Sequence, residues 1–216
     1  MNARAWFNKS LDAEAEALAA RTKAERQRHG QEAIDAVLAA ASLGHHDALL
    51  AMGVYYQHGA FGIIPVRLDL AEHWLRLAVT ANDGTGMLAL ATLLMQTGRQ
   101  AEGRRWLRKA LAHGVGGAAC HLGRALEDSA PSRALRLYLK GAELGDPFAA
   151  VCAGMMLEKR NSTSALLQAQ ALYRKAVRKG FPGAEEELER VRRRLEAEGP
   201  RRPRSVRKRQ TTKSPR

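Results

Sequence analysis

The fold of this protein follows from a repeated phrase whose clearest copy is GRRWLRKALAHGVGGA, residues 103–118. Gly103, Trp106, Ala110, Gly114 and Ala118 give its form: small, bulky, small, Gly and small. Four more copies keep this spacing, although Ala36 is not bulky and Asn82 replaces Gly: Ala33-Ala36-Ala40-Gly44-Ala48, Ala71-Trp74-Ala78-Asn82-Gly86, Ala134-Leu137-Gly141-Gly145-Ala149 and Ala169-Leu172-Ala176-Gly180-Ala184. The last anchors of the five copies are 38, 32, 31 and 35 residues apart, a period typical of stacked supersecondary units.

The spacing of the phrase predicts one helix per copy, which we call helix B. Its first three positions share one face, where two small residues let a neighbouring helix approach and the bulky residue fills the gap. The fourth position would then end the helix, because Gly or Asn readily adopts the left-handed conformation found there. Helices are expected at 31–43, 68–81, 99–113, 131–144 and 164–179.

A second apolar helix, helix A, is expected after each last anchor. Its apolar positions lie four, five and eight residues beyond that anchor: Met52-Gly53-Tyr56, Leu90-Ala91-Leu94, Leu122-Gly123-Leu126 and Ala153-Gly154-Leu157. The expected A helices cover residues 48–58, 86–97, 117–128 and 147–160. Alternation of A and B helices predicts an all-α fold, an α/α solenoid of helical hairpins.

Together these residues resemble the Sel1-like repeat, a relative of the tetratricopeptide repeat, over about residues 31–184. The best copy contains these family positions: Ala48, Met52, Gly53, Tyr56, Gly59, Ala71, Trp74 and Ala78. Later copies depart from the family pattern, because Thr97, Ser129 and Arg160 replace its Gly after Tyr, and Leu137 and Leu172 replace its Trp. The resemblance implies a tetratricopeptide-like superhelix and an adaptor role in assembling complexes.

The chain divides into four expected parts. Residues 1–30 form an N-terminal cap with a charged helix near 10–28, and residues 31–184 form the repeat array. Residues 185–198 form a polar C-terminal capping helix that starts near Pro182, because Glu185, Glu186 and Glu187 suit its positive end. Residues 199–216 form a basic tail that has almost no apolar side chain except Val206, which predicts disorder.

Charge is unevenly distributed along the sequence. The net charge is +13, yet residues 1–198 carry 27 basic and 22 acidic side chains, so the tail supplies the larger part. Six of its eight basic residues form two clusters: Arg201, Arg202, Arg204, Arg207, Lys208 and Arg209. Such a segment could neutralise the phosphates of nucleic acid or an anionic surface, without reading sequence.

The expected compartment is the cytoplasm. No segment resembles the apolar core of a signal peptide or approaches the roughly 18 apolar residues of a membrane span. Cys120 and Cys152 lie in different repeats, whereas the resemblance implies that secreted cysteine-rich relatives pair cysteines within one repeat. Free thiols are therefore predicted, as is usual in a reducing compartment.

No catalytic, cofactor or metal site is expected from the motifs. His45 and His46 are adjacent rather than three or four residues apart on a helix, and His58 has no carboxylate at that spacing. Cys120 and His121 would point about 100° apart on a helix and cannot form a nucleophile and base pair. The glycines near Gly116 have no strand before them and fit a turn better than a phosphate loop.

The loop at residues 59–66 is apolar and allows two interpretations. Phe61, Ile63 and Ile64 could form an exposed partner-binding patch. Alternatively, they fold back over the first helix pair, which is what the resemblance implies and what we favour. Arg67 stands where the family has Asp, which leaves the usual capping of this loop open.

The remaining candidate site is the concave face, which the A helices should line. Its expected members are Tyr55, His58, Leu93, Gln96, His121, Arg124, Met155, Met156 and Lys159. A mixed groove of this kind suits an extended peptide or a helix better than nucleic acid, which favours basic stripes with aromatic platforms. The sequence thus favours a monomeric, non-enzymatic scaffold that binds a protein or peptide, with polyanion binding by the tail as the alternative.

Overall fold

The computed structural model describes residues 1–81 and 83–198, in which the regular structure is eleven α-helices and one short 3-10 helix. Their bounds are α1 Ala3–Ala19, α2 Lys23–Ser42, α3 His46–His58, α4 Leu68–Ala78, η1 Val79–Ala81, α5 Gly84–Gln96, α6 Gln100–Ala112, α7 Gly116–Arg124, α8 Pro131–Glu143, α9 Pro147–Glu158, α10 Thr163–Arg178 and α11 Ala184–Glu198. From α3 to α10 they alternate as the predicted A and B helices. The asparagine stop at Asn82 and the tail, with its predicted disorder, lie outside the described residues.

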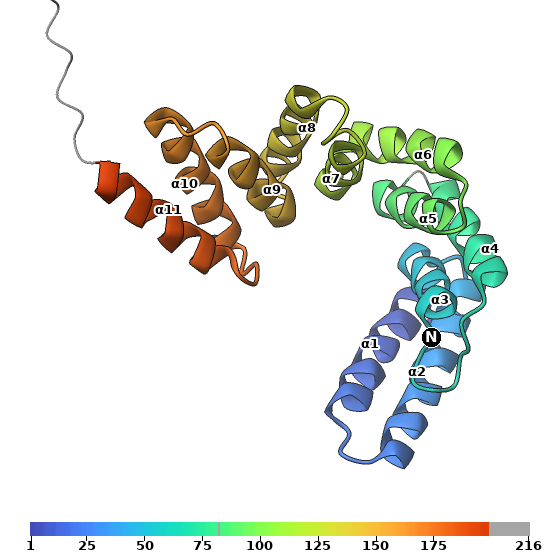
Figure 1. Cartoon of the computed structure of the whole chain (residues 1–216). Helices are drawn as coiled ribbons and strands as arrows, with labels where there is room; N and C mark the ends of the chain where they lie inside the picture. The colour runs from blue at the N-terminus through green and yellow to red at the C-terminus, as the bar shows by residue number, and fades with distance from the viewer. Residues whose placement is uncertain (82, 199–216) are drawn as a thin grey trace, which may run out of the picture.

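The helices form an open arch in which each helix packs against the next one in sequence (Figure 1). The A helices α3, α5, α7 and α9 line the inner side of the arch, and the B helices α4, α6, α8 and α10 lie on the outer side. Successive A helices also touch, α3 with α5 and α7 with α9. The predicted α/α solenoid, with its A helices on the concave side, is therefore confirmed.

Small residues set the distance between the helices of one hairpin. A methyl group on Gly123 would lie 2.9 Å from the ring of Tyr138, and one on Gly154 would lie 2.7 Å from the ring of Tyr173. These helical glycines are required because a large side chain from helix B occupies the space of their missing Cβ. The helix stops have a different cause, since Gly44, Gly114, Gly145 and Gly180 have φ values of 77°, 81°, 87° and 67°.

The N-terminal helices differ from the prediction. The expected helix at 10–28 is wrong, and the expected helix at 31–43 is present but begins earlier, because the chain turns near Thr22 and forms the hairpin α1–α2. Thr22 and Glu25 form a reciprocal capping box, in which each side chain accepts a 3.2 Å hydrogen bond from the other's backbone N–H. Gly30 lies within α2 and does not end it. A glycine is needed at this position because a Cβ would lie 2.5 Å from the Phe61 side chain.

Two further helix ends also differ. Helix α7 ends at Arg124 instead of residue 128, because tight turns follow, including a hydrogen bond from the Leu126 N–H to the Gly123 carbonyl. Helix α11 begins at Ala184, and Pro182 lies in the preceding turn, where Gly183 has a φ of 78°. The glutamates predicted for the first turn of α11 are in place.

The apolar loop after α3 folds back onto the first helix pair. Ile64 is buried, and Phe61 packs edge-on against Tyr55 with ring centroids 5.7 Å apart. The Arg67 N–H donates to the Tyr56 carbonyl at 2.8 Å, and the Arg67 guanidinium pairs with Asp69 at the start of α4. The fold-back interpretation is confirmed, and no side-chain hydrogen bond caps α4 at Arg67.

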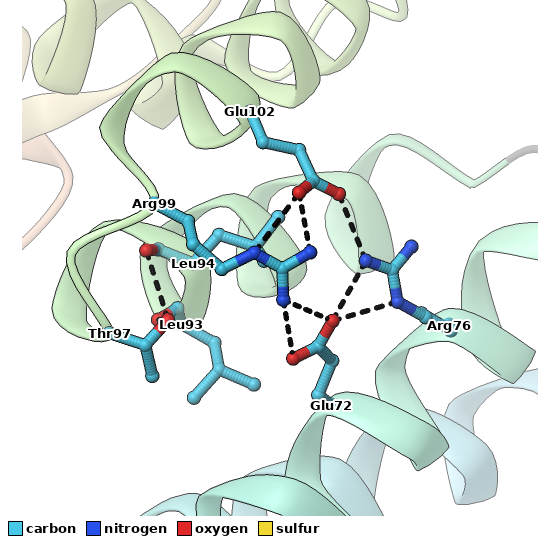
Figure 2. Close-up of polar contacts among 7 residues, drawn as sticks. All are labelled: Glu72, Arg76, Leu93, Leu94, Thr97, Arg99 and Glu102. Carbon is cyan, nitrogen blue, oxygen red and sulfur yellow. Dashed lines mark hydrogen bonds and ion pairs between the residues drawn. The ribbon is translucent and has the colours of Figure 1, made fainter.

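A ring of charged side chains connects two successive outer helices (Figure 2). Glu72 and Arg76 of α4 meet Arg99 and Glu102 at the start of α6, with Arg99–Glu72 at 2.7 Å and Arg76–Glu102 at 2.9 Å. These side chains are between 24% and 43% exposed, so solvent screens each pair and its contribution to stability is small.

Candidate functional site

The inner face of the arch, formed by the solvent-facing side chains of α3, α5, α7 and α9, is nearly uncharged. Helix α5 has no Asp, Glu, Lys or Arg, and each of the others has one: Asp47 in α3, Arg124 in α7 and Glu158 in α9. An inner face of this composition can bury a partner's apolar groups at a small desolvation cost.

Most of the predicted groove residues reach solvent. His58, Gln96, Arg124, Met155 and Lys159 are exposed, while Tyr55, His121 and Met156 are half-buried. Leu93 is a correction. It is fully buried in the core with Leu75, Leu90 and Leu94, because the face of α5 at this position packs under helix α4. Leu93 therefore supports the groove but cannot contact a partner.

At the N-terminal end, internal contacts occupy the inner face. The Tyr55 hydroxyl donates a hydrogen bond to Glu14 of α1, and burial together with this carboxylate raises the pKa of Tyr55. The buried Gln57 donates to Gln96 of the next A helix at 3.1 Å. This end is consequently built from polar bridges between helices, and its side chains are less free to bind a partner.

The central part of the face, on α7 and α9, offers more accessible apolar surface. Met155 is 47% exposed and Phe148 is 36% exposed. The Arg124 guanidinium lies 5.5 Å from the centre of the Phe148 ring, and Phe181 lies against the same ring at 5.9 Å. Phe148 was not predicted as a site residue. It is nevertheless the one aromatic residue that directly precedes a last anchor, here Ala149, in the five copies of the phrase.

At the C-terminal end of the inner face, a buried carboxylate of α9 connects this helix to α10 and α11. Glu158 accepts hydrogen bonds from the Tyr173 hydroxyl at 2.6 Å, from Arg190 at 2.7 Å and from Arg194 at 3.0 Å. Burial alone would raise the pKa of Glu158, but the hydrogen bonds from these groups lower it below its usual value. Glu158 was not predicted as a site residue. The feature that could have pointed to it is that it is the one charged residue of an otherwise apolar helix.

The thiols and the neighbouring histidine are not arranged for nucleophilic chemistry. Both cysteines are free, as predicted, and the Cys120 thiol donates to the Asp146 carboxylate, which also caps α9 by accepting from the Ala149 N–H. Burial raises the pKa of Cys120 and raises that of Cys152 to about 11, so both stay protonated at neutral pH. Burial lowers the pKa of His121, which favours its neutral form.

Among the described residues, the one cluster with metal-binding composition is Glu16, His29 and Glu32, where α1 meets α2. His29 Nδ1 lies 2.8 Å from the Glu16 carboxylate, and the Arg28 guanidinium contacts His29 Nε2 at 3.2 Å. This geometry does not favour a metal ion, because the adjacent guanidinium opposes a cation and both carboxylates are exposed. The histidines considered in the sequence are engaged separately, as His46 pairs with Asp83 at 3.0 Å and His45 stacks on Phe7.

Comparison with known proteins identifies the fold. No protein-family model and no curated protein matches this sequence. Among solved structures, c5321, a protective antigen present in uropathogenic Escherichia coli strains that displays a Sel1-like repeat fold, superposes with a TM-score of 0.70 at 22% identity over 91% of this chain. A Sel1 repeat protein from Oxalobacter formigenes superposes with a TM-score of 0.60 at 23% identity, over 76% of this chain and 74% of its own.

This chain has the Sel1-like repeat fold. It spans 43% of the length of c5321. The Sel1-like hairpins here are α3–α4, α5–α6, α7–α8 and α9–α10, with α1–α2 before them and α11 after them. None of the described helices is long and apolar enough to cross a bilayer.

Proposed function

We propose that this protein is a non-enzymatic scaffold that binds a segment of a protein partner along the inner face of α7 and α9. Two observations on a nearly uncharged face support the proposal: the exposed Met155 of α9, and the Phe148 ring about two turns before it on the same helix, against which the Arg124 guanidinium of α7 lies. An apolar anchor next to a guanidinium suits a peptide that offers an apolar side chain and a carbonyl or carboxylate. Cytoplasmic localisation and a monomeric state remain predictions from the sequence.

The test uses the full chain as bait, with nuclease treatment so that a bridging nucleic acid cannot carry a partner. Binding of the captured partner is then measured for Met155→Ala and Arg124→Ala, which should each weaken it by about 1–3 kcal/mol if these side chains are anchors. Leu167→Ala is the control, because Leu167 is 53% exposed on the outer helix α10. Unchanged affinity in both inner-face variants would reject the proposal.

A second candidate function is polyanion binding by the tail, which its composition of eight basic and no acidic residues favours. Replacing Arg201, Arg202, Arg204, Arg207, Lys208 and Arg209 by Gln in the full chain should then lower polyanion affinity and its salt dependence. The same variant should keep any partner that binds the inner face. Loss of that partner as well would favour the tail as the main binding element.

A further inference from the structure

The outer helices of the last three repeats concentrate positive charge. Helices α6, α8 and α10 contain ten basic and two acidic residues, whereas the inner helices α5, α7 and α9 contain one of each. The two sets alternate along the chain and differ in their side of the arch (Figure 1). The basic residues of the array therefore gather on its outer side.

Nine of these side chains are exposed, and we name them the outer basic face: Arg105, Arg108, Lys109, Arg133, Arg136, Lys140, Arg174, Lys175 and Arg178. The small residues that pack toward the inner helices on the same three helices, such as Ala110, Ala134 and Ala176, are fully buried. Because the small residues face inward, the exposed cations face away from the inner helices. Several repeat from one hairpin to the next, as Arg105 corresponds to Arg136, and as Lys109, Lys140 and Lys175 occupy the same position of the phrase in three successive hairpins.

The outer basic face is not neutralised within the part of the chain that the structure describes. Lys140 is its one member with an ion pair there, to Glu143 at 3.6 Å. The acids of the same repeats bind elsewhere: Glu102 lies in the ring with Arg76 and Arg99, and Glu127 accepts from Tyr138. Mutual repulsion of the cations is unfavourable, and an external polyanion would relieve it.

A concave feature continues this face at its C-terminal end. A shallow hollow of about 550 Å³ lies between α10 and α11, and four of its lining residues are basic: Arg174, Lys175, Arg178 and Arg192. Its other lining residues, Ala171, Val177 and Leu188, are small or apolar, and none is acidic. Guanidinium groups in such a hollow can bind one phosphate from two sides.

We propose that the outer basic face binds nucleic acid through its phosphate backbone, with the hollow between α10 and α11 as the strongest point of contact. Six of the nine cations are arginine, whose planar fork suits phosphate oxygens. The face follows the curved outer side of an arch, which a flexible single strand can track, while a flat bilayer or a stiff duplex would touch only part of it. The one tryptophan on these helices, Trp106, is half-buried beneath Lys109, so base stacking is not offered and binding is independent of sequence. This proposal does not depend on partner binding by the inner face.

The test measures the affinity of the full chain for labelled duplex DNA and single-stranded RNA at several salt concentrations. The triple variant Arg108→Gln, Arg136→Gln and Arg174→Gln removes one exposed cation from each outer helix. It should weaken binding by roughly tenfold or more at low salt and reduce the salt slope by about 2–3, near 0.9 for each lost phosphate contact with a duplex. The control Arg21→Gln, Lys23→Gln and Arg26→Gln removes the same charge from exposed positions around the start of α2.

Three results would overturn the proposal. The control could lose as much affinity as the triple variant, which would indicate a general charge effect. The triple variant could bind as wild type while neutralisation of the tail abolishes binding. The protein could bind vesicles that contain anionic lipid and lose that binding in the triple variant, while it does not bind nucleic acid. An unchanged melting temperature would show that the triple variant is folded. The matching triple variant with Lys at the same three positions retains the charge and should keep the salt slope of wild type.

Discussion

At the scale of single residues, one correlated set of side chains closes the last two hairpins, α7–α8 and α9–α10. The Tyr138 hydroxyl donates to Glu127 and the Tyr173 hydroxyl donates to Glu158, and each ring fills the space above a glycine of the inner helix. The earlier repeats have Leu75 and Leu107 in place of the tyrosines, and Gln57 and Met95 in place of the glutamates. Tyrosine and glutamate therefore occur together, because a buried hydroxyl needs an acceptor.

Gly154→Ala should destabilise the fold, since the new methyl group would lie 2.7 Å from the Tyr173 ring. Overpacking of this kind costs about 1–3 kcal/mol, measurable by urea unfolding. Gly86→Ala is the matched control, because its methyl group would meet Ala78 and Val79 at an ordinary 3.6 Å. Gly86→Ala should be neutral or stabilise by up to about 1 kcal/mol through helix propensity. Equal effects of the two substitutions would contradict this packing.

Both thiols should react slowly in the native protein, because burial raises the pKa of Cys120 and raises that of Cys152 to about 11. The thiolate is the reactive form and is scarce at neutral pH. A disulfide reagent should modify little of the native protein and two thiols after denaturation without reductant. A count near zero after denaturation would instead indicate a disulfide and an oxidising compartment.

At the scale of the helices, α11 completes the array by taking the place of one more inner helix (Figure 1). Its Leu188 and Val191 are buried in the last core cluster, and its arginines Arg190 and Arg194 reach Glu158 of α9. The opposite side of α11 is polar. A solenoid requires such an end, because an uncovered last repeat would expose its apolar face.

The attachment of α11 should depend on pH through Glu158. Its pKa is lowered from the usual 4.5 in the folded state, because hydrogen bonds from Arg190 and Tyr173 outweigh the effect of burial. A lowered folded-state pKa stabilises the protein above the unfolded value, and this contribution is lost as the pH falls through the folded value. The Glu158→Gln substitution should therefore lower the free energy of unfolding by about 1–3 kcal/mol at neutral pH. On acidification the stability of this variant should decrease less than that of wild type.

Urea unfolding over a pH series from neutral to about pH 3 measures this difference, because the folded-state pKa of Glu158 lies below 4.5. The control is Glu143→Gln, since the Glu143 side chain is 66% exposed and its pair with Lys140 should contribute little. A Glu158→Gln protein as stable as wild type at neutral pH would show that Arg190 and Arg194 do not hold α11 in place.

At the scale of the whole molecule, stability is distributed along a line. Packing joins each helix to the next in sequence, and four core clusters follow one another along the array. In such an array the free energy of unfolding is close to a sum of hairpin and nearest-neighbour contributions. Damage at one end should consequently spread weakly to the other.

Hydrogen exchange read by mass spectrometry tests this expectation. Gly154→Ala should reduce protection in α8 to α11 and leave α1 to α3 as in wild type. Gly53→Ala, whose methyl group would lie 2.5 Å from Leu75, should give the opposite pattern. A uniform loss of protection in both variants would mean that the array unfolds as one cooperative unit.

Helix alternation and the glycine stops were predictable from the chain alone, because periodicity and left-handed residues act within a few positions. The placement of the A helices on the concave side was expected from the resemblance to the Sel1-like repeat. The pairing of α1 with α2, the burial of Leu93 and the binding of Glu158 by Arg190 and Arg194 were not predictable in this way. The outer basic face also needed the structure, since each arginine looks like an ordinary surface residue until its partners are known. These features depend on contacts across the array, and local spacing does not encode which distant side chains meet.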